Sequence, residues 1–171
     1  AVGPAFGSAL TRTIGGLDHR DVLQALVGGL ADEGMTARIV RIRHTSDCAF
    51  IGHAGAQLSG SGIAIGLQSK GTTVIHRRDL VPLENLELFA MAPNMDLGTY
   101  RQIGRNAALH ALGKPAAPMP ARISPWAIYD VFTVKDGEQI FLAAVSDAQW
   151  QTFCDALGFA DLKADTALKL N

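Results

Sequence analysis

Residues 44–93 read HTSDCAFIGHAGAQLSGSGIAIGLQSKGTTVIHRRDLVPLENLELFAMAP, and this stretch carries the clearest structural pattern of the chain. A short helix is predicted over 47–57. Two runs of small or β-branched apolar residues follow at 62–67 and 72–75, and the polar sequence QSKG at 68–71 separates them. The stretch therefore predicts a helix followed by strand, turn and strand.

The flanking sequence adds two longer helices and a further strand. Apolar residues recur at helical spacing over 17–33, where Asp18 is a candidate N-cap and Gly34 a stop, and again over 97–112. The run ARIVRIRH at 37–44 predicts a strand. Because strands alternate with helices, we predict an α/β fold with a mostly parallel sheet and flanking helices.

The C-terminal part has a different composition. Residues 121–171 hold seven of the eleven aromatic residues and carry net negative charge, whereas 1–120 are slightly basic. Two extended runs, 129–134 and 139–145, flank KDGE, which favours a β-hairpin. Ser146 or Asp147 can cap a following helix that ends at Gly158.

The proline-rich run GKPAAPMP at 113–120 separates the two parts. Its prolines fix φ, remove N–H donors and disfavour helix. We predict a domain over 1–112, a connector over 113–125, and a hairpin and helix segment over 126–171 that packs on the first domain.

Composition and charge exclude several classes of protein. The chain has 171 residues, 48% hydrophobic and 18% charged, with a formal net charge of −1, which provides no general attraction for nucleic acid. No run of about 18 apolar residues is present to cross a membrane. Cys48 and Cys154 cannot build a disulfide framework. We therefore expect a cytosolic protein with two buried or inert thiols and no nucleic-acid or membrane partner.

Motif patterns indicate no nucleotide, metal or hydrolase centre. Gly60 and Gly62 lack the third glycine of the dinucleotide fingerprint, and they precede a predicted strand instead of following one. The five histidines form no i, i+4 pair and accompany no CxxC. Ser61 does not lie in GxSxG. The glycines are better explained as a tight entry into a buried strand, and the histidines as core or surface residues.

Three polar residues are the candidates for ligand binding. In a parallel sheet, ligands bind beyond the carboxyl ends of the strands, which corresponds to the loops near Asp47, Lys70 and Asn85. Each residue also has a structural explanation, as a helix cap, a solvated turn residue and a turn former respectively. The residues alone leave both explanations open.

Residues 44–93, together with TYRQIGRNAA at 99–108, resemble the medium (β) subunit of adenosylcobalamin-dependent diol and glycerol dehydratases. The resemblance covers about 1–112. It implies a Rossmann-like layer that binds the lower, nucleotide-bearing side of adenosylcobalamin and pairs with large and small subunits, the large subunit holding the substrate. By motif, Asp47 in HTSD, Lys70 in QSKGTT and Asn85 in LENLELF would contact the corrin side arms. Association with a bacterial microcompartment is a further alternative for its location.

Residues 129–171 resemble an internal stretch of family III CoA-transferases, through FTVKDGEQIFLA and DAQWQTFCDALG. The segment that carries that family's catalytic aspartate is not recognisable, so transferase activity is not implied. The chain therefore resembles a fusion of two fragments, natural or engineered.

Three functional hypotheses follow. The first is a truncated or fused medium subunit that binds adenosylcobalamin, has no catalytic residue of its own and is inactive alone. The second is a non-catalytic fusion that has lost cobalamin binding and serves as an interaction module, with homo-oligomer formation as an option. The third is a fragment of a family III CoA-transferase.

Overall fold

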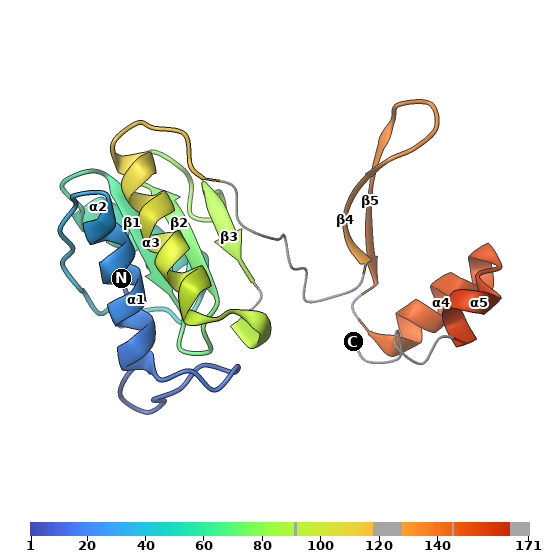
Figure 1. The fold of residues 1–171 in the computed structure, drawn as a ribbon, viewed down its shortest axis with the longest axis horizontal. Helices are drawn as coiled ribbons and strands as arrows, with labels where there is room; N and C mark the ends of the chain where they lie inside the picture. Colours follow the sequence, from blue (N-terminus) through green and yellow to red (C-terminus); the bar gives the residue numbers. More distant parts are fainter. Residues whose placement is uncertain (91, 118–127, 145, 165–171) are drawn as a thin grey trace. The chain divides into compact units, whose positions relative to one another are not determined.

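The structure, a computed structural model, describes residues 1–90, 92–117, 128–144 and 146–164. The chain divides into two compact units, Ala1–Arg122 and Ile123–Asn171. Figure 1 shows the elements of each unit. Most of the predicted connector, residues 118–125, lies outside the described residues. The predicted domain boundaries and the packing of the second part on the first stay predictions.

The three α-helices that the structure describes in the first unit each follow an aspartate. α1 (His19–Asp32) follows Asp18, α2 (Cys48–Leu58) follows Asp47, and α3 (Leu97–Ala111) follows Asp96. The chain leaves α1 through Gly34, whose φ of +76° favours glycine. These bounds agree with the predicted helices within about two residues.

The sheet of the first unit is antiparallel, so the predicted mostly parallel, Rossmann-like sheet is wrong for its strands. β1 (Ile63–Leu67), β2 (Thr73–Arg77) and β3 (Glu87–Phe89) lie in that order, with Ile65 opposite Ile75 and Val74 opposite Leu88. The physical reason is the connections: parallel neighbours need a crossover of about a dozen residues, usually a helix. Residues 68–72 form only a tight turn.

The strand predicted over 37–44 is reduced to a single bridge. Among the described residues, parallel pairing occurs in this sheet only where Val2 lies beside Arg41 and Leu67. The Val2 N–H donates to the Val40 carbonyl at 2.8 Å, and its carbonyl accepts from Ile42 N–H at 2.9 Å. These two bonds make a ladder too short to form a strand over the predicted residues 37–44.

Helices cover both faces of the sheet. Ile63, Leu67 and Ile75 point to one face, where they share a buried core with α1 and α3. Alternate residues face α2, and a Cβ on Gly66 would lie only 2.5 Å from the Gly52 nitrogen. Figure 1 shows α1 and α3 side by side over the sheet. The first unit thus has three layers: α1 and α3 form the first, the sheet the second, and α2 the third.

α1 and α3 touch backbone to backbone. A Cβ on Gly29 would lie 1.9 Å from the Arg101 carbonyl oxygen, and one on Gly104 would lie 2.2 Å from the Leu26 carbonyl oxygen. Arg101 also donates to both carboxylate oxygens of Asp32, at 2.8 and 2.7 Å. Only glycine allows helices this close.

The second unit matches the predicted hairpin and helix. β4 (Ile128–Thr133) pairs antiparallel with β5 (Gln139–Ala144), and Gly137 in the turn has φ +80°. α4 (Asp147–Leu157) begins at Ser146, whose side chain accepts from the Gln149 N–H. It ends at Gly158 in the left-handed region, and α5 (Ala160–Ala164) follows.

The cap of α3 provides a test of local stability. Asp96 Oδ1 accepts from the Thr99 N–H at 2.7 Å and from its hydroxyl at 2.8 Å, and these bonds hold the pKa of Asp96 below its ordinary value of 3.8. We expect Asp96→Ala to lower the free energy of unfolding by about 1 kcal/mol in urea titrations at pH 7. Asp96→Asn should retain most of this stabilisation, since asparagine also caps helices.

The contribution of the Asp96 charge has a defined pH dependence. Because its pKa is lower in the folded chain, the stabilisation is complete above about pH 5 and is lost as the pH falls through the folded pKa. The difference between the wild type and Asp96→Asn should therefore shrink below pH 4. A difference that stays constant to pH 2 would contradict this assignment.

Candidate functional site

The turn between β1 and β2 is held by hydrogen bonds from other segments of the first unit. Three consecutive carbonyls in it accept hydrogen bonds from three other segments. These bonds run from His19 Nε2 to the Ser69 oxygen (2.8 Å), from Ile14 N–H to the Lys70 oxygen (3.0 Å) and from Tyr100 Oη to the Gly71 oxygen (2.9 Å). These three bonds hold the backbone of the turn in place.

His19 is a buried clamp behind this turn. Its Nδ1 lies 2.8 Å from the Gly7 N–H, which can only donate, so Nε2 carries the proton that it gives to Ser69. The ring stacks on Phe6 with centroids 3.8 Å apart. This contact set joins the first loop, α1 and the turn. The sequence pattern alone did not identify this role.

Lys70 projects from the fixed turn into solvent. Its Nζ forms no hydrogen bond or ion pair with any part of the chain that the structure describes. A free ammonium on a rigid backbone can donate to a carbonyl or phosphate oxygen without first breaking an internal bond.

Asp47 lies at the same edge but has a structural task. Its Oδ1 accepts from the N–H groups of Ala49 and Phe50 at 2.9 and 3.1 Å, which caps α2. Gln68 Nε2 donates to the Ser46 carbonyl at 3.2 Å and ties the segment before α2 to the turn. Oδ1 is thus engaged, and only Oδ2 remains for a ligand.

Asn85 lies at the other end of β2. It is half-buried in the loop between β2 and β3, next to Leu86, whose N–H donates to the Ile75 carbonyl. The antiparallel order therefore separates Asn85 from Lys70 by the length of β2, about 13 Å at ~3.3 Å per residue. The structure brings Asp47 and Lys70 to one edge and leaves Asn85 outside it.

The cysteine beside Asp47 is buried. Cys48 Sγ donates to the Thr72 and Gly66 carbonyls at 3.2 and 3.4 Å, and burial raises its pKa to about 12. Burial likewise raises the pKa of Tyr100. A protonated, enclosed thiol is neither a nucleophile nor a metal ligand at neutral pH. The sequence prediction of buried thiols is confirmed for Cys48 and Cys154.

The part of the chain that the structure describes contains neither a metal-binding cluster nor a membrane-spanning helix. No group of three or more His, Cys, Asp or Glu side chains in these residues is placed to hold a metal ion. None of the helices that the structure describes combines the length and the apolar character needed to cross a membrane.

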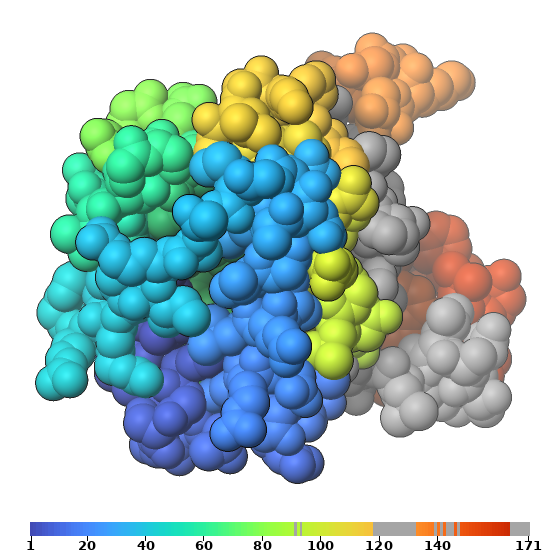
Figure 2. All heavy atoms as spheres, turned by 60° about the vertical axis from the view of Figure 1, so that its left-hand side comes forward, coloured from blue at the N-terminus to red at the C-terminus, as the bar shows by residue number. Residues whose placement is uncertain are grey.

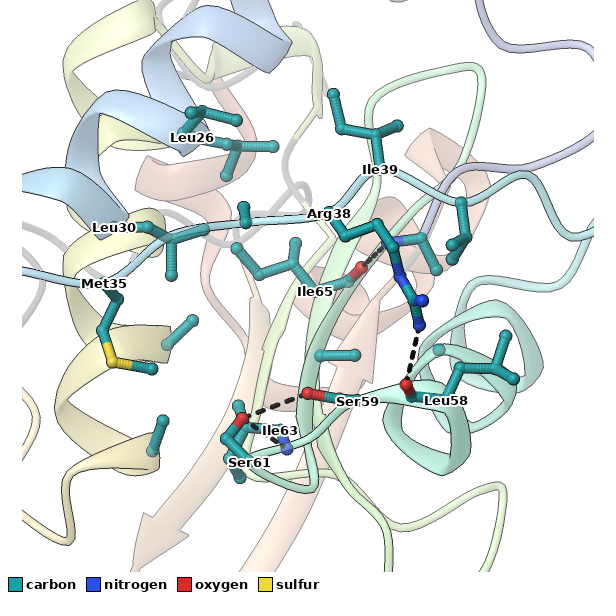
Figure 3. Close-up of a pocket in the computed structure, with 18 of the residues that line it drawn as sticks. Leu26, Leu30, Met35, Arg38, Ile39, Leu58, Ser59, Ser61, Ile63 and Ile65 are labelled. Carbon is teal, nitrogen blue, oxygen red and sulfur yellow. Dashed lines mark hydrogen bonds between the residues drawn. The ribbon is translucent and has the colours of Figure 1, made fainter.

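A pocket of about 490 Å³ lies beside β1, away from the three predicted residues. Its walls are β1, the inner face of α1, the segment 35–40 and the end of α2, and most of its lining is apolar. Figure 2 shows the face of the molecule with α1 in blue and the following segment in cyan, and Figure 3 shows the lining side chains. Sequence reasoning missed this pocket because it predicted a strand at 37–44.

The fold and the site together place the first unit in a class of small three-layer α/β domains. Its turn between β1 and β2 is held by hydrogen bonds and carries the exposed Lys70. The chain belongs to the dehydratase medium subunit family, whose profile matches residues 3–117. A profile of CoA-transferase family III matches residues 97–171. Both resemblances expected from the sequence are thus found.

Solved structures similar to this chain include two dehydratase-reactivating proteins. A glycerol dehydratase reactivase is 21% identical with a TM-score of 0.54, and the match covers 58% of this chain and 87% of that one. A diol dehydratase-reactivating factor complexed with ADP and Mg²⁺ is 20% identical with a TM-score of 0.49, covering 57% and 86%. The first of these similarities supports the fold alone.

Proposed function

We propose that this chain is a medium-subunit component of a coenzyme B12-dependent diol or glycerol dehydratase. In this proposal it binds the lower, nucleotide-bearing side of adenosylcobalamin and pairs with a large catalytic and a small subunit. The observation that carries the proposal is the family match over residues 3–117. When bound, the cofactor would supply the radical chemistry, and this chain would supply none.

The edge formed by Asp47 and Lys70 fits a cofactor with amide side arms and a phosphate. Lys70 can donate to an amide carbonyl or to the phosphate, because its ammonium has no internal partner among the described residues. The free Oδ2 of Asp47 can accept from an amide NH₂ group while Oδ1 keeps capping α2. These two residues would hold and orient the ligand.

Asn85 fits the proposal less well. It lies beyond the opposite end of β2 from Lys70, so one ligand would have to extend along the strand to reach all three residues. This geometry favours the second candidate function, a scaffold or interaction module of the same family that does not bind cobalamin. A CoA-transferase fragment is the third candidate, supported by the match over 97–171.

The experiment is equilibrium dialysis of the 171-residue chain against cobalamin, with and without a candidate large subunit, read by the visible spectrum. We expect retention, and about tenfold weaker retention for Lys70→Ala, the loss of one charge-assisted hydrogen bond at an exposed position. Lys114→Ala, which removes an exposed lysine just beyond α3, is the matched control and should not change retention.

The variants also separate binding from folding. Lys70→Ala should not change the midpoint of thermal unfolding, because only its backbone carbonyl takes part in the turn. Asp47→Asn removes the charge while keeping a good helix cap, so it tests the contact with the cofactor independently of α2. If no cobalamin is retained even with the large subunit present, the interaction-module function replaces the proposal.

A further inference from the structure

Two histidine rings meet on the face of the sheet that α2 covers. The rings of His53, in α2, and His76, in β2, have centroids 5.1 Å apart and planes at 72° to each other. His76 is fully buried and His53 is half-buried. The helix lies close to the strand here, since a Cβ on Gly52 would lie 3.1 Å from the His76 Cβ. Two imidazoles are thus held between one helix and one strand.

The His76 ring faces a carbonyl oxygen at each nitrogen. Its Nδ1 lies 2.8 Å from the Arg77 oxygen, and its Nε2 lies 3.2 Å from the Pro82 oxygen. Both oxygens can only accept, whereas a neutral imidazole has a single N–H to donate. If that N–H is at Nδ1, which has the shorter contact, Nε2 presents a lone pair to the Pro82 oxygen. Two buried acceptors that face each other are unfavourable unless a cation lies beside both.

His53 has a ring nitrogen without a partner. Its Nδ1 is buried and forms no hydrogen bond with any part of the chain that the structure describes. By contrast, both ring nitrogens of the buried His19 have partners. A buried polar atom without a partner is rare in folded proteins, and a bound ion is one of its ordinary explanations.

The contacts of His76 have the geometry of a metal ligand. Zinc binds histidine nitrogen at about 2.0 Å, so neighbouring ligand atoms of a tetrahedral site lie about 3.3 Å apart, and Nε2 lies 3.2 Å from the Pro82 oxygen. A metal-bound histidine typically donates its other N–H to a carboxylate or backbone carbonyl, as Nδ1 can to Arg77. The 5.1 Å between the ring centroids allows a nitrogen of His53 to approach the same ion.

We propose that His53 Nδ1, His76 Nε2 and the Pro82 carbonyl bind one divalent transition-metal ion that prefers imidazole, such as Zn²⁺, with water as a fourth ligand. Imidazole nitrogen suits zinc, copper and nickel, whereas Mg²⁺ and Ca²⁺ prefer oxygen ligands. The site has two ionisable side chains, fewer than the three of the clusters that the described residues lack, because a backbone oxygen supplies the third ligand.

The ion would join α2 to the loop between β2 and β3. Pro82 is half-buried between the exposed Val81 and Leu83, so an ion can reach its carbonyl from solvent. The same loop carries Asn85. None of the contacts that define the metal site involves Lys70 or its turn, so the site is independent of the proposed cobalamin edge.

The experiment is titration of the full chain with Zn²⁺ by isothermal titration calorimetry, with excess Mg²⁺ present. We expect saturable binding of one ion per chain and at least tenfold weaker binding by His53→Ala. This substitution breaks no hydrogen bond of the described residues, because Nδ1 has no partner. His44→Ala, which removes an exposed histidine before α2, is the matched control and should not change the affinity.

Two further readouts assign the ligands. In the ¹⁵N spectrum of the histidine rings, Zn²⁺ should shift His76 Nε2 and His53 Nδ1 but leave both nitrogens of His19 unchanged. Zn²⁺ should also raise the midpoint of thermal unfolding in the wild type and His44→Ala, and not in His53→Ala. Absence of saturable binding, equal affinity of the wild type and His53→Ala, weaker binding by His44→Ala, or a His76 ring protonated on both nitrogens that takes up no Zn²⁺ overturns the proposal.

Discussion

Replacing Gly29 by alanine will lower the free energy of unfolding of the first unit by about 3 kcal/mol, at the upper end of overpacking penalties. The added Cβ would lie 1.9 Å from the Arg101 carbonyl oxygen and 2.9 Å from the Arg105 nitrogen. Both are backbone atoms in the middle of α3, so neither can rotate away. α1 and α3 must separate, which opens the core that they share with the sheet. Circular dichroism at 222 nm during thermal unfolding measures the effect.

Gly28, the neighbouring residue in α1, is the matched control. A Cβ there would meet only the guanidinium of Arg101, nearest at Nη1, 2.7 Å away, which is the end of a flexible side chain. The bonds to Asp32 use the other two nitrogens of Arg101, Nε and Nη2. Gly28→Ala should therefore change stability by less than about 1 kcal/mol, since the helix propensity of alanine offsets a small shift. Equal destabilisation by both substitutions would contradict the backbone contact.

The sequence predicted the local elements of this protein better than their pairing. The helical spacing of Tyr100, Ile103, Ala107 and Ala111 predicted one stripe of α3; the first three are buried and Ala111 is half-buried against the same core. The cap at Asp47 and the stop at Gly34 also lie where expected, whereas Asp18 holds the N-cap position of α1 without a capping side-chain bond. Local periodicity does not determine strand direction, and the short turn at 68–71 was a stronger constraint than the general alternation of helices and strands.

The predicted grouping of Asp47, Lys70 and Asn85 depended on the direction of the strands. In a parallel sheet, the loops carrying Lys70 and Asn85 would lie at one edge, and the antiparallel order places them at opposite ends of β2. Asp47 was predicted both as a cap and as a ligand contact, and the structure shows the cap. The His19 clamp and the pocket beside β1 depend on contacts between residues far apart in the chain, which a single sequence does not reveal.

Cys48 will react with iodoacetamide about a thousandfold more slowly in the folded chain than in urea at pH 8. The thiolate is the reactive species, and burial raises the pKa from 9.0 to about 12, which lowers the thiolate fraction by about that factor. The thiol also donates to the carbonyls of Thr72 and Gly66, which favours the protonated form. Peptide mapping by mass spectrometry separates the reaction at Cys48 from that at Cys154.

The same pKa difference predicts that the folded chain becomes less stable at alkaline pH. The unfolded thiol loses its proton near pH 9, whereas the folded thiol keeps it to about pH 12, so stability must fall as the pH rises through this interval. Tyr100 contributes in the same direction above pH 10, since burial raises its pKa too. Cys48→Ala is the control: it removes the thiol's share, so its stability should fall less steeply between pH 9 and 11 than that of the wild type. Equal slopes, together with fast alkylation of folded Cys48, would mean that α2 opens from the sheet often enough to expose the thiol to solvent.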